Sequence, residues 1–261
     1  MSCICNEKNN CTCCIEVESC CVEYDNILAL DNVSFSIPKG SFIGVLGPNG
    51  GGKSTLFNAI AGLEKITHGK ISINGKSPVE SMGKISYVPQ KEMINWKFPL
   101  SVYDVVSQGK IRGGSFRNIL GFSDDLVVDS LKKVNMYEKK NEMIANLSGG
   151  EKQRTFIARA LAQESEILLL DEAFSGVDFG SQEDISDVLK LLTSESKTIL
   201  MSTHDLNSLS DRYDKVLCLN GHICAYGSPE KVLTEEVLKE LYGVHKDRLI
   251  DHRIGNHNND L

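Results

Sequence analysis

Residues 47–55 read Gly47-Pro48-Asn49-Gly50-Gly51-Gly52-Lys53-Ser54-Thr55 and fit the pattern G-x-x-x-x-G-K-[ST]. This segment stands between an apolar run, 41–46, and a helical pattern, 53–62, that ends at a glycine. Glycines let backbone N–H groups turn inward around phosphate oxygens, and the following helix adds the positive end of its dipole. An ordinary glycine-rich turn is the alternative. The strand, spacing, lysine and hydroxyl together favour a phosphate-binding loop, with Lys53 at the β- and γ-phosphates and Ser54 on Mg²⁺.

The rest of the chain alternates short apolar runs with helical patterns. The runs 167–170 and 198–202 are typical of strands buried on both faces of a parallel sheet. Apolar residues at i, i+3, i+4 and i+7 predict an amphipathic helix over 185–192. Further strands are expected at 29–37, 70–73 and 84–88, and helices at Ser123 and after Gly149-Gly150. These patterns predict an α/β sheet with a helical lobe, residues 90–164, inserted into it.

Composition narrows the class of protein. The 261 residues carry 28 Lys and Arg against 35 Asp and Glu, for a net charge of −7, and 41% are hydrophobic. The chain is too apolar for disorder, and an acidic chain with no dominant basic stripe is a poor candidate for binding nucleic acid. Its longest stretch without Asp, Glu, Lys or Arg, 216–229, is too short and polar to span a bilayer. No signal peptide is apparent, so a cytosolic protein is expected.

The cysteines are unevenly distributed along the chain. Seven of the nine lie within the first 21 residues: Cys3, Cys5, Cys11, Cys13, Cys14, Cys20 and Cys21. We therefore expect residues 1–21 to be a Cys-rich tail outside the folded domain. The spacings Cys-x-Cys and Cys-x-Cys-Cys suit thiolate binding of soft metals. The alternatives are a disordered tail with incidental cysteines, or synthesis that begins near Val17 or Val22.

Two carboxylates, Asp171 and Glu172, follow the apolar run 167–170 directly. In open α/β sheets the ligand lies beyond the carboxyl ends of the strands, so these acids can face the same site as the phosphate loop. A pair of solvated carboxylates is the alternative when the motif is taken alone. Together with the phosphate loop, the pattern indicates nucleotide hydrolysis, with Asp171 in the second shell of the metal and Glu172 as general base.

The segment Leu147-Ser148-Gly149-Gly150-Glu151-Lys152-Gln153-Arg154 precedes another helical pattern. Between a phosphate loop and an Asp-Glu strand, it resembles the signature of ATP-binding cassette (ABC) ATPases. The resemblance implies that Tyr24 stacks on adenine, that Gln90 reaches Mg²⁺ and links the core to the helical lobe, and that His204 contacts the γ-phosphate. It also implies that residues 175–178 couple two sites, and that Ser148, Gly149 and Gly150 cap the γ-phosphate held by Lys53 of a second copy. ATP and Mg²⁺ are the implied cofactors.

The resemblance covers residues 22–243 and implies a P-loop NTPase cassette with a mainly parallel sheet, an antiparallel β edge and the inserted helical subdomain. Residues 244–261, with three histidines, are expected to be a polar tail. Two cassettes are expected to form a homodimer on the cytoplasmic face of the cell membrane, bound to a separate integral membrane permease. The basic stretch 105–123 faces that permease or lipid in one interpretation and is a solvated loop in the other.

Residues 94–102, Ile-Asn-Trp-Lys-Phe-Pro-Leu-Ser-Val, narrow the resemblance further. They are similar to the corresponding segment in ATPases of manganese, zinc and iron importers, which receive their ion from an extracytoplasmic metal-binding protein. Importers of iron chelates or haem, and a soluble ATPase of iron–sulfur assembly, remain the alternatives. The sequence departs from the family pattern at three places: at Gly51 and Ala173, where Ala and Pro are usual, and at Glu151-Lys152, where Gln is common.

Overall fold

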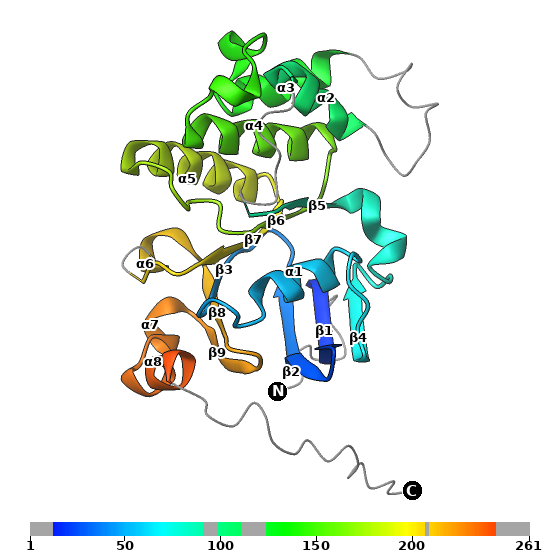
Figure 1. Cartoon of the computed structure of the whole chain (residues 1–261), viewed down its shortest axis with the longest axis vertical. Coiled ribbons are helices and arrows are strands. Elements are labelled where there is room, and N and C mark those ends of the chain that lie inside the picture. The colour runs from blue at the N-terminus through cyan, green and yellow to red at the C-terminus, as the bar shows by residue number, and fades with distance from the viewer. Residues whose placement is uncertain (1–12, 91–98, 111–123, 207–208, 244–261) are drawn as a thin grey trace, which may run out of the picture.

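The computed structural model describes residues 13–90, 99–110, 124–206 and 209–243 (Figure 1). The strands are β1 (Cys13–Tyr24), β2 (Ile27–Pro38), β3 (Phe42–Leu46), β4 (His68–Ile73), β5 (Ile85–Val88), β6 (Ile167–Leu170), β7 (Thr198–Thr203), β8 (Lys215–Leu219) and β9 (Ile223–Gly227). The α-helices are α1 (Lys53–Ile60), α2 (Val102–Ser107), α3 (Asp124–Lys133), α4 (Gly149–Ala162), α5 (Phe179–Ser194), α6 (Leu209–Arg212), α7 (Pro229–Val232) and α8 (Glu235–Tyr242). Short 3₁₀ turns are η1 (Val79–Lys84), η3 (Gln108–Lys110), η5 (Tyr137–Lys139) and η6 (Ile144–Asn146).

The strands form two sheets. One has the order β5-β6-β7-β3-β8-β9, and all its neighbours are parallel except the edge pair β8–β9. The other is antiparallel, with the order β2-β1-β4. This arrangement confirms the expected fold class. Because β3 lies between β7 and β8, the loop that follows it leaves from the interior of the parallel sheet.

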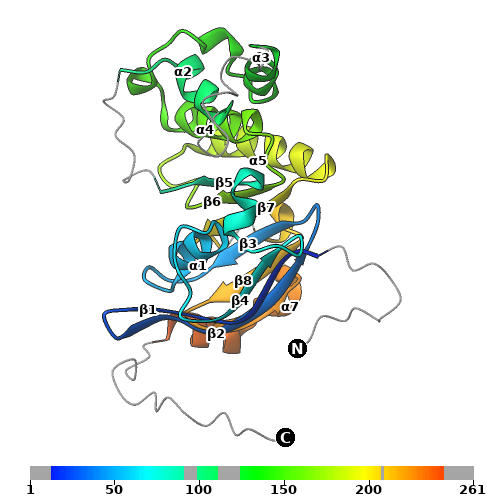
Figure 2. The same cartoon turned by 90° about the vertical axis from the view of Figure 1, so that its right-hand side faces the viewer.

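Strands β3 and β6 are buried on both faces, which explains why they are continuously apolar. On β3, Phe42 and Leu46 join the core under the helical lobe, whereas Ile43 and Val45 join a second core with α1 and the antiparallel sheet. Figures 1 and 2 both place α4 and α5 on one side of the sheet and α1 on the other. The sheet therefore separates two hydrophobic cores.

The helical lobe is built from α2, α3 and α4, which pack on one another. Val127, Leu131 and Val134 are fully buried, as their spacing predicts. Helix α4 begins at Gly149, two residues earlier than expected, because Ser148 serves as its N-cap. Residues 91–98 and 111–123 lie outside the described residues, and with them most of the segment 94–102 and of the basic stretch. The bounds 90–164 remain a prediction. None of the helices in the described ranges is long and apolar enough to cross a membrane.

The expected boundary of the N-terminal tail at residue 21 is wrong. Residues from Cys13 onward form β1, the middle strand of the antiparallel sheet, which pairs with β2 on one side and β4 on the other. Cys14 and Cys20 are buried, and the Cys14 thiol donates to Thr198 Oγ1 at 3.2 Å. Clustered cysteines and register shifts obscured the alternation of buried and exposed side chains that marks a strand. Cys3, Cys5 and Cys11 lie outside the described residues.

Candidate functional site

The phosphate-loop segment joins the end of β3 to the start of α1. Gly50 and Gly52 have φ of 76° and 89°, in the left-handed region that favours glycine. A Cβ on Gly52 would lie 2.7 Å from the Ala29 carbonyl oxygen, and one on Gly47 would collide with the Leu219 carbonyl oxygen. The Gly51 N–H donates to the Pro48 carbonyl at 3.0 Å and closes the turn. Neighbouring backbone thus fixes the glycine spacing of the motif.

Lys53 is buried within this loop, with 6% of its surface exposed. Its ammonium donates to the carbonyl oxygens of Gly47 and Pro48, both at 2.9 Å. Burial lowers the pKa of Lys53, and the nearby carboxylates of Glu172 and Asp171 oppose that shift. The next two residues, Ser54 and Thr55, lie in the first turn of α1, where the Ser54 side chain is exposed.

Asp171 and Glu172 follow β6 directly. Asp171 is only 4% exposed, and its carboxylate accepts from Ser202 Oγ at 2.6 Å and from Tyr87 Oη at 3.3 Å. The solvated-carboxylate alternative therefore fails for Asp171. Burial, followed by the charge of Asp171, raises the pKa of the Tyr87 phenol, which keeps this donor protonated. Ser202 and Tyr87 were given no role by the sequence, although Ser202 stands only two residues before His204.

Gln90 and Glu172 meet across two neighbouring strands. Gln90 Nε2 donates to Glu172 Oε2 at 2.7 Å, and the Glu172 N–H donates to Ser202 Oγ at 2.7 Å. Glu172 has a φ of 49°, a left-handed conformation uncommon outside glycine, Asn and Asp. Backbone and side chain of Glu172 are therefore both held, the backbone by Ser202 of β7 and the side chain by Gln90, which follows β5.

His204 comes directly after β7, and its side chain is exposed. Since β5, β6, β7 and β3 are consecutive parallel strands, Gln90, Glu172, His204 and the phosphate loop all leave the same edge of the sheet. The structure thus brings together the residues predicted for nucleotide hydrolysis within one chain.

Tyr24 is the last residue of β1, and 40% of its surface is exposed. Its hydroxyl donates to Glu64 Oε2 at 2.8 Å. Burial of the ring, with this hydrogen bond, raises the pKa of Tyr24. Stacking on adenine stays a prediction for this residue.

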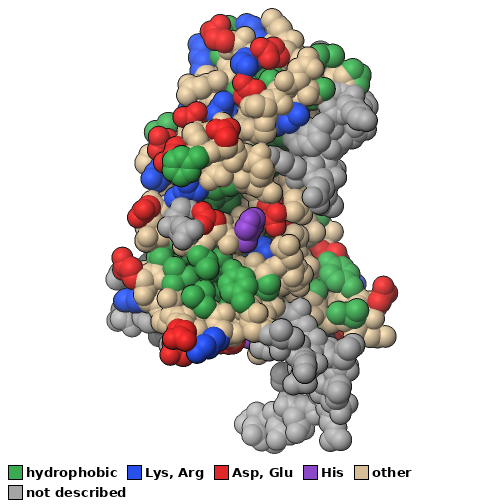
Figure 3. Space-filling model, turned by 60° about the vertical axis from the view of Figure 1, so that its left-hand side comes forward, with side chains coloured by type: hydrophobic (Ala, Val, Ile, Leu, Met, Phe, Trp, Pro, Cys, Tyr) green, Lys and Arg blue, Asp and Glu red, His purple; other side chains and the backbone are tan. Residues whose placement is uncertain are grey.

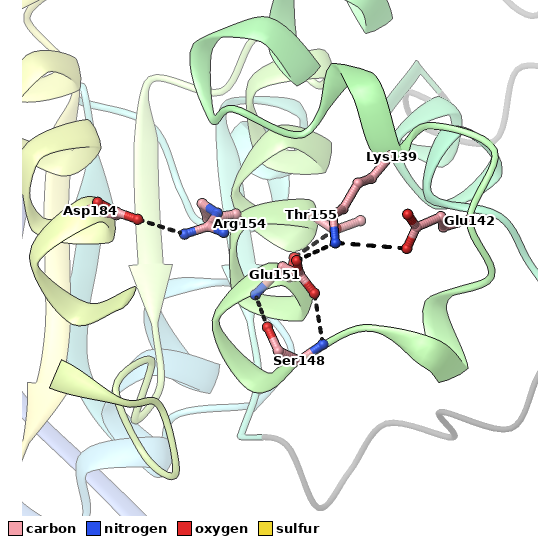
Figure 4. Close-up of polar contacts among 7 residues, drawn as sticks. All are labelled: Lys139, Glu142, Ser148, Glu151, Arg154, Thr155 and Asp184. Atoms are coloured by element: carbon pink, nitrogen blue, oxygen red, sulfur yellow. Dashed lines mark hydrogen bonds and ion pairs between the residues drawn. The ribbon is translucent and has the colours of Figure 1, made fainter. Parts of the chain in front are cut away.

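The signature residues form the start of α4 (Figure 4). The Glu151 N–H donates to Ser148 Oγ at 3.3 Å, and the Ser148 N–H donates to Glu151 Oε2 at 2.8 Å, which makes a reciprocal capping box. Lys139 pairs with Glu151 Oε1 at 2.6 Å and with Glu142 at 3.9 Å. The glutamate that departs from the family pattern thus has a definite structural role, which its sequence position did not reveal.

Helix α4 also packs closely on the start of α5. A Cβ on Gly150 would lie 2.5 Å from Ser181 Cβ, so glycine is required there. Asp178 caps α5 by accepting from the Ser181 N–H at 2.9 Å, and Arg154 pairs with Asp184 at 3.2 Å. The predicted coupling loop, 175–178, is therefore adjacent to the signature in the same chain.

Figure 3 shows the side of the molecule seen at the left of Figure 1, where α6 lies. Acidic and basic side chains are interspersed over its upper part, and hydrophobic side chains gather in its lower half. No single sign of charge dominates this side.

The two predicted magnesium ligands, Ser54 and Gln90, and the predicted second-shell carboxylate, Asp171, fit that ion chemically. Ser54 offers a hydroxyl, Gln90 an amide and Asp171 a carboxylate, and Mg²⁺ prefers such oxygen donors. Asp171 already accepts two hydrogen bonds, which holds its carboxylate in a fixed orientation. The donor set contains no soft ligand.

Comparison with known proteins identifies the relatives of this chain. The sequence model of the ABC transporter family matches residues 30–175. The manganese transport system ATP-binding protein MntB of Halalkalibacterium halodurans is 43% identical, over 87% of this chain and 91% of that protein. The manganese transport system ATP-binding protein MntA of Synechocystis sp. is 41% identical, over 88% of this chain and 90% of that protein.

Solved structures show the same architecture. The ADP conformation of an ATP-binding cassette of an ABC transporter aligns with a TM-score of 0.75 at 26% identity, over 87% of this chain and 97% of that chain. A further structure, cbiO1 of Clostridium perfringens from the ABC transporter complex cbiONQ, aligns with a TM-score of 0.73 at 27% identity, over 88% and 94% of the two chains.

Proposed function

We propose that the cargo of this transporter subunit is a divalent metal ion. The premise is that this chain belongs to the ABC transporter family and is an ATP-hydrolysing subunit of such a transporter. Manganese is the first candidate, because relatives above 40% identity are described as parts of manganese transport systems; zinc and iron follow. This kinship favours a bare ion over an iron chelate or haem, and transport over iron–sulfur assembly.

Hydrolysis is assigned to the edge of the sheet where the phosphate loop and the acids meet. The glycine loop and Lys53 bind the β- and γ-phosphates, and Tyr24 supports the adenine ring. Glu172 takes the proton of the attacking water as general base, Gln90 holds that carboxylate in place, and His204 contacts the γ-phosphate. The observation that carries this assignment is the Gln90–Glu172 hydrogen bond beside the buried Asp171.

Magnesium is assigned to Ser54 and Gln90 as ligands, with Asp171 in the second shell. When bound with ATP, Mg²⁺ neutralises negative charge on the β- and γ-phosphates. Hydrogen bonds from the Ser202 and Tyr87 hydroxyls hold the Asp171 carboxylate in a fixed orientation for that role.

The second half of the site is assigned to another copy of the chain. Ser148, Gly149 and Gly150 stand at the N-terminus of a 14-residue helix, whose dipole favours a phosphate. In a head-to-tail homodimer they cap the γ-phosphate bound by Lys53 of the second copy. ATP binding then closes the pair and hydrolysis opens it.

The transporter needs further chains. An integral membrane permease conducts the ion, this ATPase binds it at the cytoplasmic face of the membrane, and an extracytoplasmic metal-binding protein delivers the ion through the permease. Nucleic acid has no place in this scheme.

The test is transport by the purified complex. The chain is co-purified with its permease and reconstituted in vesicles with the binding protein, and Mn²⁺, Zn²⁺ and Fe²⁺ uptake is measured by elemental analysis. We expect ATP-dependent uptake of one of these ions that Lys53→Ala abolishes. The control Lys65→Ala alters an exposed lysine beyond α1 and should transport normally. Uptake of haem or an iron chelate without uptake of any free ion would refute the proposed cargo.

A further inference from the structure

Three potential metal ligands meet at the edge of the parallel sheet, apart from the hydrolysis site. His222 lies in the β8–β9 turn, Cys224 on β9 and Glu240 on α8. One ligand atom from each lies within 4.8 Å of the other two. His222 Nε2 is 2.8 Å from Glu240 Oε1 and 3.8 Å from Cys224 Sγ.

These distances are close to those between the ligand atoms of a tetrahedrally coordinated cation. With Zn–N and Zn–O bonds of about 2.1 Å and a Zn–S bond of about 2.3 Å, ligand atoms stand roughly 3.4 to 3.6 Å apart. On binding a cation, the distance between His222 Nε2 and Glu240 Oε1 has to increase slightly, and that between His222 Nε2 and Cys224 Sγ has to decrease slightly. Both His222 and Glu240 side chains are more than 40% exposed, so they have room to move and a cation has access.

The donor set also restricts the metal. A thiolate and an imidazole suit Zn²⁺ and similar borderline cations, whereas Mg²⁺ and Ca²⁺ take oxygen ligands. Burial, with the Glu240 carboxylate, raises the pKa of the Cys224 thiol to about 11, so the cation displaces that proton into solvent on binding. Three protein ligands leave the fourth position for water.

The turn that holds His222 contacts the phosphate loop. The Gly221 N–H donates to the Gly51 carbonyl at 2.8 Å, and the Asp31 N–H donates to the Gly221 carbonyl at 2.7 Å. Asn220 Nδ2 donates to the Leu241 carbonyl at 3.0 Å and so ties the turn to α8. A cation shared by the turn, β9 and α8 would strengthen this second connection.

We propose that His222, Cys224 and Glu240 form a binding site for a thiophilic divalent cation, with Zn²⁺ as the test occupant, and that its occupancy fixes the turn that supports the phosphate loop. The alternative is that the His222–Glu240 hydrogen bond serves only to hold α8 on the hairpin. Only a metal site makes binding depend on the Cys224 sulfur.

Binding is tested on the full-length chain carrying Cys3→Ser, Cys5→Ser and Cys11→Ser, so that thiols before the described region add no signal. Co²⁺ is titrated under reducing conditions and followed by thiolate-to-cobalt charge-transfer absorption, and Zn²⁺ affinity is measured by displacement. We expect one equivalent. His222→Ala, Cys224→Ser and Glu240→Gln should each weaken Zn²⁺ binding by at least about tenfold.

Matched controls replace the same residue types elsewhere. His68→Ala and Cys21→Ser alter partly or fully exposed residues of the antiparallel sheet, and Glu235→Gln alters the first residue of α8. These variants should bind Zn²⁺ normally. Binding that persists in the three site variants, or is absent from the parent, overturns the site.

The effect on the turn is tested by hydrogen exchange of the Gly221 amide. We expect Zn²⁺ to slow this exchange in the parent and in Glu235→Gln, but not in Glu240→Gln. Zn²⁺ binding without slower exchange overturns the second half of the proposal. None of the three ligands belongs to the hydrolysis site, so ATP hydrolysis without added Zn²⁺ should survive in all three site variants. Failure of the Zn²⁺-binding or hydrogen-exchange tests therefore leaves the proposed function standing.

Discussion

The phosphate loop and the signature both place glycines at the start of a helix, yet the two helix N-termini are capped differently. Helix α1 follows Gly52, which makes no side-chain cap, whereas α4 follows Ser148 and has a complete capping box with Glu151. An uncapped terminus leaves its first N–H groups for a ligand, whereas a capped one satisfies part of them internally.

This difference indicates how the two halves contribute to a site. The phosphate loop has buried Lys53, and the acids Asp171 and Glu172 lie close enough to influence its pKa, so in our proposal one chain supplies all the groups of this half. The signature is a stable helix start whose hydrogen-bond and ion-pair partners, Glu151 and Lys139, lie in its own lobe. It has no need of phosphate to fold, and in our proposal it acts only when a second copy supplies one.

The largest expected effect comes from Glu172→Gln, which alters the phosphate-loop half alone. Glutamine keeps the shape of the side chain and the contact with Gln90 but lacks a basic carboxylate. Hydrolysis should fall on the order of 10²–10⁴-fold while ATP affinity barely changes. Phosphate release and equilibrium ATP binding measure the two quantities.

The same variant should accumulate as a dimer with ATP and a monomer with ADP in size-exclusion chromatography, because the step that opens the pair is blocked. Wild-type hydrolysis by Glu172→Gln would transfer the role of general base to another group, with His204 the first candidate.

The next largest effect is expected when the phosphate loop and the signature are inactivated in different chains. Lys53→Ala removes the cation of the phosphate loop, and Ser148→Arg blocks the signature, so each variant alone should be nearly inactive. A mixture forms dimers with one doubly defective site and one intact site, and should regain part of the ATPase activity. As a control, Lys53→Ala mixed with a chain carrying both substitutions should regain none. A mixture that stays inactive while mixed dimers form would count against the shared site.

The smallest expected effect concerns the signature helix itself. The hydrogen bond with Lys139, followed by that from the Ser148 backbone, lowers the pKa of Glu151 to about 2 from its ordinary 4.5. A carboxylate with a lowered folded pKa stabilises the fold above about pH 4.5, and this contribution is lost as the pH falls toward 2. Glu151→Gln preserves the capping box but not the ion pair, so it should cost less than about 1 kcal/mol at neutral pH.

That cost should shrink steadily between pH 5 and pH 3 in urea unfolding. Glu138→Gln, which changes an exposed neighbour, should show no such trend. A cost for Glu151→Gln that is independent of pH would show that the ion pair with Lys139 contributes nothing.

The sequence predicted the strands of the parallel sheet best where both faces are buried. The runs that became β3 and β6 are apolar throughout, β7 is apolar from Ile199 to Met201, and the motifs after them mark where each strand ends. The hairpin β8–β9 was not predicted, because its residues mix apolar and polar types and β9 is only half-buried along its length. Strand β1 was mistaken for a tail because its bulges and cysteines hide the alternation that marks a strand.

Motifs predicted the chemical groups of the site but not what holds them. Gln90, Asp171 and Glu172 could be named from their order along the chain, whereas Ser202 and Tyr87 come from different strands and are defined only by their contacts with Asp171. The pair Lys139–Glu151 likewise joins residues that share no motif. Supporting residues depend on tertiary distance, for which a single sequence has no signal.

The hydrogen bonds of the Lys53 ammonium to the carbonyl oxygens of its own loop have a consequence for nucleotide affinity. Its charge is already withdrawn from water and held by two carbonyl oxygens of the loop, so the cost of desolvating that charge falls on folding rather than on ATP binding. ATP then replaces the carbonyl partners of the ammonium with phosphate oxygens, an exchange of hydrogen bonds at nearly constant burial. Such preorganisation favours ligands whose phosphate oxygens can replace the carbonyl oxygens as hydrogen-bond partners of Lys53. Adenosine, which has no phosphate, gains nothing from it.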